Sequence, residues 1–446
     1  MLLIIVLISI IAAFTSCFLF NWSYYVILYA FSDFVLFTLE WVIKLIYTAV
    51  LIIVFFAILF YIYQCFQSKV IPVVHYSDEN FYQIIASAAP IIKQCYIPTF
   101  MWGHCGHIQT IIFALWGRFN CPNVKGERIT LKLADGATMS YDIFHSSNSE
   151  NSNEEVMFFV APGFANNSET DYIRTFMQYV TSLGYRCAVL NHLGTLPNFP
   201  VTSPRIFSFG NTNDLHAALT DYISKYPKAK VILFGYSLGG NIVPKYLGEK
   251  RERSPNIIAG FSICSLLDAN RAIHKREQSR VLKYFYQYFL ARSIKTIVQR
   301  HRDILLSDEV VRRHNLDVKS IFNAMSLVKF DELYTRRLHN FDSLKDYYDW
   351  SSAIHYLDGI KVPMIFINCL DDPLVSEKMM NPAREFAKRR SKVIAIELKY
   401  GGHLGFFENN CFISESITWL EKALIQLAEA IYKDYKLQHS IEQQQE

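Results

Sequence analysis

The feature that most constrains the fold of this chain is the stretch Val231–Asn241, which reads Val-Ile-Leu-Phe-Gly-Tyr-Ser-Leu-Gly-Gly-Asn. Its first four residues are apolar and rich in β-branched and aromatic types, which favours a buried strand. The strand runs directly into a G-x-S-x-G pattern centred on Ser237, typical of a sharp strand-to-helix turn that exposes the serine hydroxyl. We expect a helix to follow, with Pro244 in its first turn. An ordinary turn of small residues is the alternative interpretation.

Two later loops supply the partners that a serine nucleophile needs. Asp371 and Asp372 follow an apolar run that begins at Val362, and His403 lies in a glycine-rich loop after the last apolar run. A histidine can take the serine proton, and a carboxylate can orient the imidazole and stabilise its cation. We prefer Asp372 as this acid because a Pro-Leu-Val run follows it, with Asp371 as the alternative. A packing role is the alternative interpretation of His403.

A tetrahedral oxyanion on the substrate would need two preorganised backbone donors. The N–H of Leu238, at the expected helix start, is one. We assign the other to Phe164, in the loop after the strand 156–160, because Gly163 lets the backbone approach closely there. The sequon that begins at Asn166 lies in this same loop, and we expect it to be unmodified because a glycan would crowd the site.

Serine, then aspartate, then histidine, each in a loop after an expected strand, is the chain order of an α/β-hydrolase triad, so we predict this fold over residues 127–435. A hairpin is expected about Asp135-Gly136, and the strands and helices that follow alternate, which indicates a mostly parallel central sheet with helices on both faces. Between about residues 270 and 350 helical, aromatic and basic sequence replaces this alternation, so we predict a helical cap insertion. We interpret residues 69–126 as a linker and N-terminal extension, and 436–446 as a disordered tail.

Residues 1–68 hold most of the apolar excess of a chain that is 51% hydrophobic. Leu45–Tyr63 has no charged residue and has aromatic residues near both ends, which predicts a membrane-spanning helix. Leu2–Phe20 is also uncharged, so the chain could cross the membrane once or twice. No basic residue precedes this stretch, which does not favour a cleaved signal peptide. Lys44 and Lys69 flank the surer span on opposite sides and do not orient it. We predict attachment to the plasma membrane or the endoplasmic reticulum.

The chain of 446 residues has a net charge of only +4, which argues against a nucleic-acid partner. His104, Cys105 and His107 form a short cluster with no second set of ligands nearby in the sequence, so we favour a structural loop over a metal site and expect no cofactor. Residues 271–313 hold eleven basic and four acidic residues, a local charge of +7. A solvated face is the main interpretation of this stretch, and attraction to an anionic membrane is the alternative.

The run from about Tyr96 to Tyr435 resembles the membrane-anchored abhydrolase family. The motifs that carry the likeness are Gly106-His-Ile-Gln-Thr110, Tyr172-Ile-Arg-Thr-Phe176, Gly184-Tyr-Arg-Cys-Ala-Val-Leu-Asn-His-Leu-Gly194, Thr202-Ser-Pro-Arg205, Ser237-Leu-Gly-Gly-Asn-Ile-Val243, Lys245-Tyr-Leu-Gly-Glu249, Ser343-Leu-Lys-Asp-Tyr-Tyr348, Asp371-Asp-Pro-Leu-Val375 and Gly401-Gly-His-Leu-Gly-Phe-Phe-Glu408. In that family the triad acid is the second aspartate, which implies Asp372. Members of that family look as if they cross the membrane once, so the additional apolar stretch Leu2–Phe20 departs from the family pattern.

The resemblance implies a membrane-bound serine hydrolase that cleaves carboxylic esters of lipids, most of all monoacylglycerols, with the triad Ser237, Asp372 and His403. An acyltransferase or thioesterase would use the same acyl-serine and differ only in the acyl acceptor. A catalytically silent membrane receptor or scaffold is a further alternative, against which the intact triad argues. The expected partners are a lipid ester and a membrane.

Overall fold

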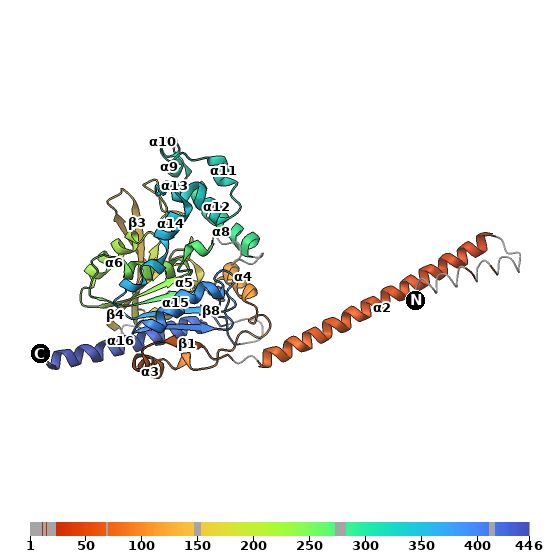
Figure 1. The fold of residues 1–446 in the computed structure, drawn as a ribbon, viewed down its shortest axis with the longest axis horizontal. Coiled ribbons are helices and arrows are strands. Elements are labelled where there is room, and N and C mark those ends of the chain that lie inside the picture. The colour runs from red at the N-terminus through yellow and green to blue at the C-terminus, as the bar shows by residue number, and fades with distance from the viewer. Residues whose placement is uncertain are drawn as a thin grey trace. The chain divides into compact units, whose positions relative to one another are not determined.

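The computed structural model describes residues 11, 15, 24–67, 70–146, 153–272, 282–409 and 415–445. The chain divides into two compact units, Met1–Ser68 and Lys69–Glu446. The first unit contains the 44-residue helix α2 (Tyr24–Gln67), drawn in Figure 1 as a single long helix. Within the described residues, the one helix long and apolar enough to cross a membrane is Ser32–Tyr63.

Helix α2 fits a membrane anchor and contains all of the predicted span Leu45–Tyr63. At about 1.5 Å per residue it is about 66 Å long, more than the roughly 30 Å of a hydrocarbon core. Its charged residues, Asp33, Glu40 and Lys44, all lie before this span, and Glu40 pairs with Lys44 at 2.6 Å. The other predicted span, Leu2–Phe20, lies outside the described residues apart from two positions.

The second unit is built on a nine-stranded sheet with the order β1-β9-β8-β7-β6-β4-β5-β3-β2. The six strands β4 to β9 are parallel, whereas β1 at one edge and the pair β2 and β3 at the other are antiparallel. The expected hairpin at Asp135-Gly136 joins β2 to β3. The strands are β1 (Val73–Tyr76), β2 (Glu127–Lys132), β3 (Thr138–Phe144), β4 (Asn153–Ala161), β5 (Tyr185–Asn191), β6 (Lys230–Tyr236), β7 (Ile257–Ile263), β8 (Met364–Cys369) and β9 (Val393–Leu398).

Helices cover both faces of this sheet, because its central strands are apolar on both sides. In β6, Val231 and Leu233 pack into one core and Ile232 and Phe234 into the other. The first core also holds residues of α6, α7 and α15, and the second holds residues of α3, α5 and α16. These helices, with η1 and α4, are α3 (Glu79–Ala88), η1 (Pro90–Ile92), α4 (Gly106–Trp116), α5 (Asp171–Ser182), α6 (Asn213–Lys225), α7 (Leu238–Gly248), α15 (Glu377–Arg389) and α16 (Trp419–Gln445).

A helical cap interrupts the alternation between β7 and β8, as the composition of residues 270–350 predicts. Figure 1 shows most of its helices gathered on one side of the sheet. Residues 273–281 of the basic stretch lie outside the described residues. The elements between the two strands are η2 (Ala269–Ala272), η3 (Leu282–Tyr286), α8 (Gln287–Arg300), α9 (Arg302–Leu305), α10 (Asp308–Arg313), α11 (Val318–Phe322), α12 (Leu327–Phe330), η4 (Asp331–Thr335), α13 (Arg336–Leu338), α14 (Leu344–Ser351), η5 (Ala353–His355) and η6 (Leu357–Gly359).

Residues 70–126 are part of the catalytic unit, so the prediction of a linker over 69–126 is wrong for them. Strand β1 pairs with β9, and α3 buries Phe81 and Ile85 in the core that it shares with α16. Tyr96 is buried as well, and its hydroxyl donates to the carbonyl of Phe407 at 2.7 Å. Each strand or helix of this segment is too short to show a strong periodicity of apolar residues. The residues that the segment contacts lie some 300 positions later in the sequence.

The predicted disordered tail 436–446 is also wrong, because α16 continues to Gln445. Lys, Glu and Gln are good helix formers, so a polar composition alone does not exclude a helix. The amide of Gln438 donates to Asp434 one turn earlier at 2.7 Å and accepts from Lys392 at 2.8 Å. This last bond ties the start of the predicted tail to the sheet.

We expect a chain that begins at residue 70 to fold and a chain that begins at residue 127 to fail. The shorter chain loses β1 and α3, which leaves β9 as an edge strand paired only with β8 and uncovers apolar residues of α16. Circular dichroism, thermal unfolding and resistance to limited proteolysis would compare the two. A cooperative, protease-resistant 127–446 chain would contradict this assignment.

Candidate active site

Ser237 lies at a strained turn between β6 and α7, with φ 51° and ψ −108°. A non-glycine residue in such a conformation costs on the order of 1–3 kcal/mol, so the surroundings must hold it. Ser237 N–H donates to Ile263 of the neighbouring strand at 2.8 Å. A Cβ at Gly235 would lie 2.1 Å from the carbonyl oxygen of Gly239, and one at Gly239 would lie 1.9 Å from that of Ala161. Only glycine fits at these two positions, which explains the G-x-S-x-G spacing.

Pro244 lies in the second turn of α7, so the prediction that it occupies the first turn is wrong. A proline within a helix leaves the carbonyl four residues earlier without its usual donor. That carbonyl belongs to Gly240, and the hydroxyl of Ser262 on β7 donates to it at 2.6 Å. The neighbouring strand therefore satisfies the group that the proline leaves open.

The structure brings the three predicted catalytic side chains together. The Nε2 atom of His403 lies 2.8 Å from Ser237 Oγ, and its Nδ1 lies 2.8 Å from Asp372 Oδ2. The other carboxylate oxygen of Asp372 accepts from the backbone N–H groups of Leu374 at 2.7 Å and Val375 at 3.0 Å. A carboxylate at Nδ1 keeps the imidazole proton on that nitrogen, which leaves Nε2 free to accept the serine proton.

Asp371 lies beside this relay and does not take part in it. Its Oδ1 accepts from the N–H of Gly402 at 2.9 Å, and its Oδ2 is buried with no hydrogen-bond partner among the described residues. Burial raises the pKa of Asp371 to about 6. Gly106 packs so closely here that a Cβ would lie 1.9 Å from the carbonyl oxygen of Asp371. Asp371 thus fixes the loop that carries His403, which we call the histidine loop, whereas Asp372 contacts the imidazole ring.

Helix α4 forms hydrogen bonds with the histidine loop on its other side. The sequence interpretation missed this role. Thr110 Oγ1 accepts from the backbone N–H of His403 at 2.8 Å. Gln109 accepts from Phe407 N–H at 3.0 Å and donates to the carbonyl of Gly103 at 2.6 Å. The interpretation of this segment as a structural loop is wrong, because the helix begins at Gly106. The only sign of this role in the sequence is the motif Gly106-His-Ile-Gln-Thr110.

The side chains of His104, Cys105 and His107 are not among the described groups whose ligand atoms converge. His107 Nδ1 lies 3.0 Å from the hydroxyl of Tyr286. Among the described residues, the one group of His, Cys, Asp or Glu side chains whose ligand atoms converge within 4.8 Å is Cys264, Cys369 and the predicted triad acid Asp372. Burial raises the pKa of both thiols, which keeps them protonated and makes them poor metal ligands.

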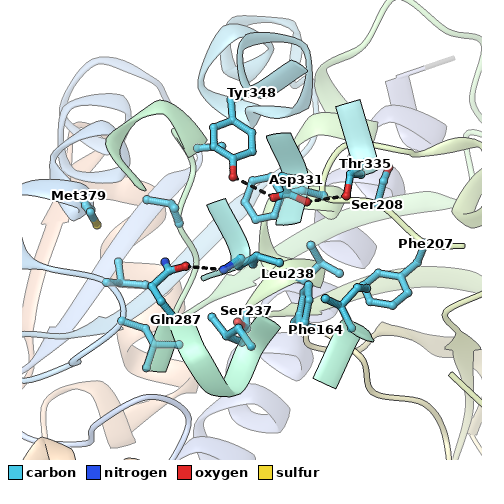
Figure 2. Close-up of a pocket in the computed structure, with 18 of the residues that line it drawn as sticks. Phe164, Phe207, Ser208, Ser237, Leu238, Gln287, Asp331, Thr335, Tyr348 and Met379 are labelled. Atoms are coloured by element: carbon cyan, nitrogen blue, oxygen red, sulfur yellow. Dashed lines mark hydrogen bonds between the residues drawn. The ribbon is translucent and has the colours of Figure 1, made fainter. Parts of the chain in front are cut away.

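The predicted oxyanion donors Phe164 and Leu238 line the same pocket as Ser237 (Figure 2). Leu238 is the first residue of α7, where N–H groups have no partner within the helix. The loop that carries Phe164 is fixed by two bonds, from Gly163 N–H to Tyr172 Oη at 3.0 Å and between the His192 ring and the carbonyl of Pro162 at 2.9 Å. Their role as donors stays a prediction.

The sequon in the same loop has little freedom to accept a glycan. Ser168 is buried and donates to Asp142 at 2.6 Å. The side-chain amide of Asn166 lies 3.4 Å from the hydroxyl of Tyr172. These contacts support the expectation that Asn166 is unmodified, which stays a prediction.

Asn241 joins the cap to the nucleophile helix. Its side-chain amide donates to the carbonyls of Phe209 and Ser351, each at 2.9 Å, and its oxygen accepts from Ala353 N–H at 2.9 Å. One turn later the buried Lys245 donates to the carbonyl of Gly210 at 2.7 Å. These two side chains therefore hold both the loop at 207–210 and the end of the cap against α7.

The pocket beside Ser237 is mostly apolar but contains one buried carboxyl group. Its apolar lining includes residues of the loop 207–209, of α8 and of the segment 374–379. Asp331 accepts from Thr335 Oγ1 at 2.6 Å and from Tyr348 Oη at 2.8 Å, as Figure 2 shows. Burial raises the pKa of Asp331 to about 6. The pocket suits a substrate with a long apolar part.

Comparison with known proteins places this geometry in a family. A family model of the alpha/beta hydrolase fold matches residues 157–410. Abhydrolase domain-containing protein 2 of Drosophila melanogaster is 41% identical over 376 residues, which are 84% of this chain and 94% of that protein. Monoacylglycerol lipase ABHD2 of Homo sapiens is 37% identical over 399 residues, 87% of this chain and 94% of that protein. Phospholipase ABHD3 of Mus musculus is 26% identical over 377 residues, 83% of this chain and 87% of that protein.

The chain belongs to the α/β-hydrolase family. The resemblance seen in the sequence is confirmed, since relatives at these identities span most of the chain. The α/β-hydrolase fold inferred from alternating strands and helices is confirmed as well. As an abhydrolase, the protein is an enzyme of the lipase or esterase class.

We expect the two neighbouring acids to differ sharply when each is changed to asparagine. Asp372→Asn should lower kcat about 10³- to 10⁴-fold, because the imidazole loses the group that fixes its tautomer. Asp371→Asn keeps an oxygen for Gly402 and should lower kcat by less than about tenfold. Steady-state kinetics with matched thermal unfolding would separate the two. A larger fall in kcat for Asp371→Asn at equal stability would reverse the assignment.

Asp331 should make stability depend on pH. An unfolded aspartate has a pKa of about 3.9, so its raised pKa means that the folded state favours the neutral carboxyl. The stability that this group contributes is complete below about pH 4 and is lost as the pH rises through 6. The melting temperature of Asp331→Asn, relative to the wild type, should therefore rise between pH 5 and pH 7.5. The exposed Asp308→Asn is the control, and a flat difference for Asp331→Asn would contradict the prediction.

Proposed function

We propose that this protein is a membrane-bound serine hydrolase that cleaves monoacylglycerols to a fatty acid and glycerol. The observation that carries the proposal is the hydrogen-bonded relay Ser237–His403–Asp372 beside a largely apolar pocket. The relative from Homo sapiens is named a monoacylglycerol lipase, which supports the choice of substrate. The length and composition of helix α2 support membrane attachment. The plasma membrane and the endoplasmic reticulum are the membranes we propose.

In the first half of the reaction, Ser237 Oγ attacks the ester carbonyl while His403 Nε2 takes its proton. Asp372 stabilises the imidazolium that forms. The carbonyl oxygen becomes an oxyanion between the N–H groups of Leu238 and Phe164. One such donor is typically worth about 2.7–4 kcal/mol of the barrier. Collapse of the tetrahedral intermediate breaks the bond to glycerol, whose oxygen takes the proton from His403, and leaves an acyl-serine.

In the second half, His403 takes a proton from a water molecule that attacks the acyl-serine. The second tetrahedral intermediate collapses to release the fatty acid and return the proton to Ser237 Oγ. An acyltransferase or a thioesterase would follow the same steps with another acceptor or leaving group. The apolar pocket, where side chains such as Leu290 and Ile294 of α8 form one wall, supports an acyl chain as the recognised part.

We expect a fluorophosphonate probe to label Ser237 and no labelling in Ser237→Ala. The same variant should lower hydrolysis of a monoacylglycerol by about 10⁴- to 10⁶-fold, because no other group can form the acyl intermediate. Ser208→Ala is the matched control, since Ser208 lines the same pocket and should remain dispensable for labelling. The measurements are in-gel fluorescence and mass spectrometry of the released fatty acid.

Equal labelling of wild type and Ser237→Ala would remove this serine from the mechanism. Adding glycerol, another alcohol or a thiol as a competing acceptor separates the alternatives. A new ester or thioester formed in preference to free fatty acid would identify an acyltransferase. Labelling without turnover of any lipid ester would favour a binding protein that retains the fold.

A further inference from the structure

Helix α4 exposes apolar side chains on its outer face, which is unusual for a helix at the surface of a water-soluble unit. It has no charged residue from Gly106 to Trp116. Its inner side, with Gln109 and Thr110, is buried against the histidine loop. Its outer side repeats at the helical spacing of three and four residues, and three of its residues are strongly exposed: Ile108 at 42%, Leu115 at 67% and Trp116 at 57%.

A second exposed apolar group lies beside this helix. The ring of His107 stacks on that of Tyr286, with centroids 5.8 Å apart, which places the start of α4 against the junction of η3 and α8. Phe285 and Phe289 flank that junction, with exposed fractions of 41% and 48% and ring centroids 4.8 Å apart. We call the surface formed by Ile108, Leu115, Trp116, Phe285 and Phe289 the α4–α8 face. Exposed apolar groups that gather on neighbouring elements, here joined through the His107–Tyr286 contact, mark interaction sites.

We infer that the α4–α8 face docks the catalytic unit onto a lipid bilayer. Its aliphatic side chains and large aromatic rings are the types that enter the boundary between head groups and acyl chains. Only residues 68 and 69 separate the end of α2 at Gln67 from the described catalytic unit at Val70. A bilayer crossed by α2 is therefore within reach of this unit at all times, at the high effective concentration that a short tether gives.

The bilayer is favoured over a protein partner because the two elements of this face also build the site. Helix α8 carries Phe289 on the exposed face and lines the pocket with Leu290 and Ile294. Helix α4 carries Leu115 outward and holds His403 through Thr110. Docking thus brings the substrate's own environment against the walls of the pocket. The inference rests on the proposed function for the identity of the substrate, although docking itself does not need catalysis.

Photocrosslinking of the full chain tests the contact directly. A benzoylphenylalanine replaces Leu115 in protein reconstituted into phosphatidylcholine vesicles, in the wild-type and Ser237→Ala backgrounds. The control position is Leu183, which is 41% exposed and precedes β5, at the sheet edge opposite the catalytic loops. We expect phospholipid adducts at 115 in both backgrounds and few at 183. Because the adduct does not depend on turnover, its failure is distinct from a failure of the proposed function.

Adducts at 115 to residues 1–68, to a second copy of the chain or to another protein would overturn the inference. Lipid adducts that are equal at positions 115 and 183 would overturn it as well.

A kinetic test uses the double variant Leu115→Ser with Phe289→Ser, with Leu183→Ser as its control. Loss of two apolar side chains that would contact lipid should lower kcat/KM about tenfold or more for a monoacylglycerol in vesicles. It should change kcat/KM less than about twofold for a short water-soluble ester. An equal effect on both substrates, or none on either, would contradict docking.

Discussion

The close approach of backbone segments around Ser237 is the constraint on which the rest of the site depends. Gly235 and Gly239 leave no room for a side chain, and the strained serine is held by a bond to β7. This turn can form only where a central parallel strand runs into a helix between two neighbouring strands. Ser237, Asp372 and His403 follow β6, β8 and β9, so the parallel arrangement brings all three to the carboxyl edge of the sheet. The fold and the catalytic relay are therefore specified by the same stereochemistry.

The sequence predicts the parts of the molecule whose signals are local. The turn at Ser237 depends on residues within a few positions of it, and the hairpin at Gly136 depends on a backbone conformation that glycine adopts readily, here at φ 81°. Asp372 could be preferred to its neighbour because a Pro-Leu-Val run follows it, and in the structure the N–H groups of Leu374 and Val375 donate to its carboxylate. The helical cap was predictable as an interruption of the alternation, although its composition does not reveal that Asn241 fixes its end.

The parts that the sequence did not predict are those whose structure depends on distant partners. Residues 73–76 form a strand because β9, more than 300 residues later, offers an open edge. The tail is helical where Gln438 accepts a hydrogen bond from Lys392, in the turn just before β9, a contact without any local signal. Thr110 and His403 are 293 positions apart, and a short uncharged helix looks like a loop until its inner side is seen against the histidine loop.

These long-range contacts mean that the histidine loop is assembled by both ends of the catalytic unit. Gly402 donates to Asp371 from within the later half, and the neighbouring His403 donates to Thr110 from the segment that follows α2. The strained turn fixes the position of Ser237, so its hydroxyl cannot follow a ring that moves. A small shift of the His403 imidazole would therefore break the 2.8 Å contact between them. The residues before the first hairpin therefore help to fix the position of His403, through the hydrogen bond to Thr110, the bond from Phe407 N–H to Gln109 and the close packing of Gly106 against Asp371.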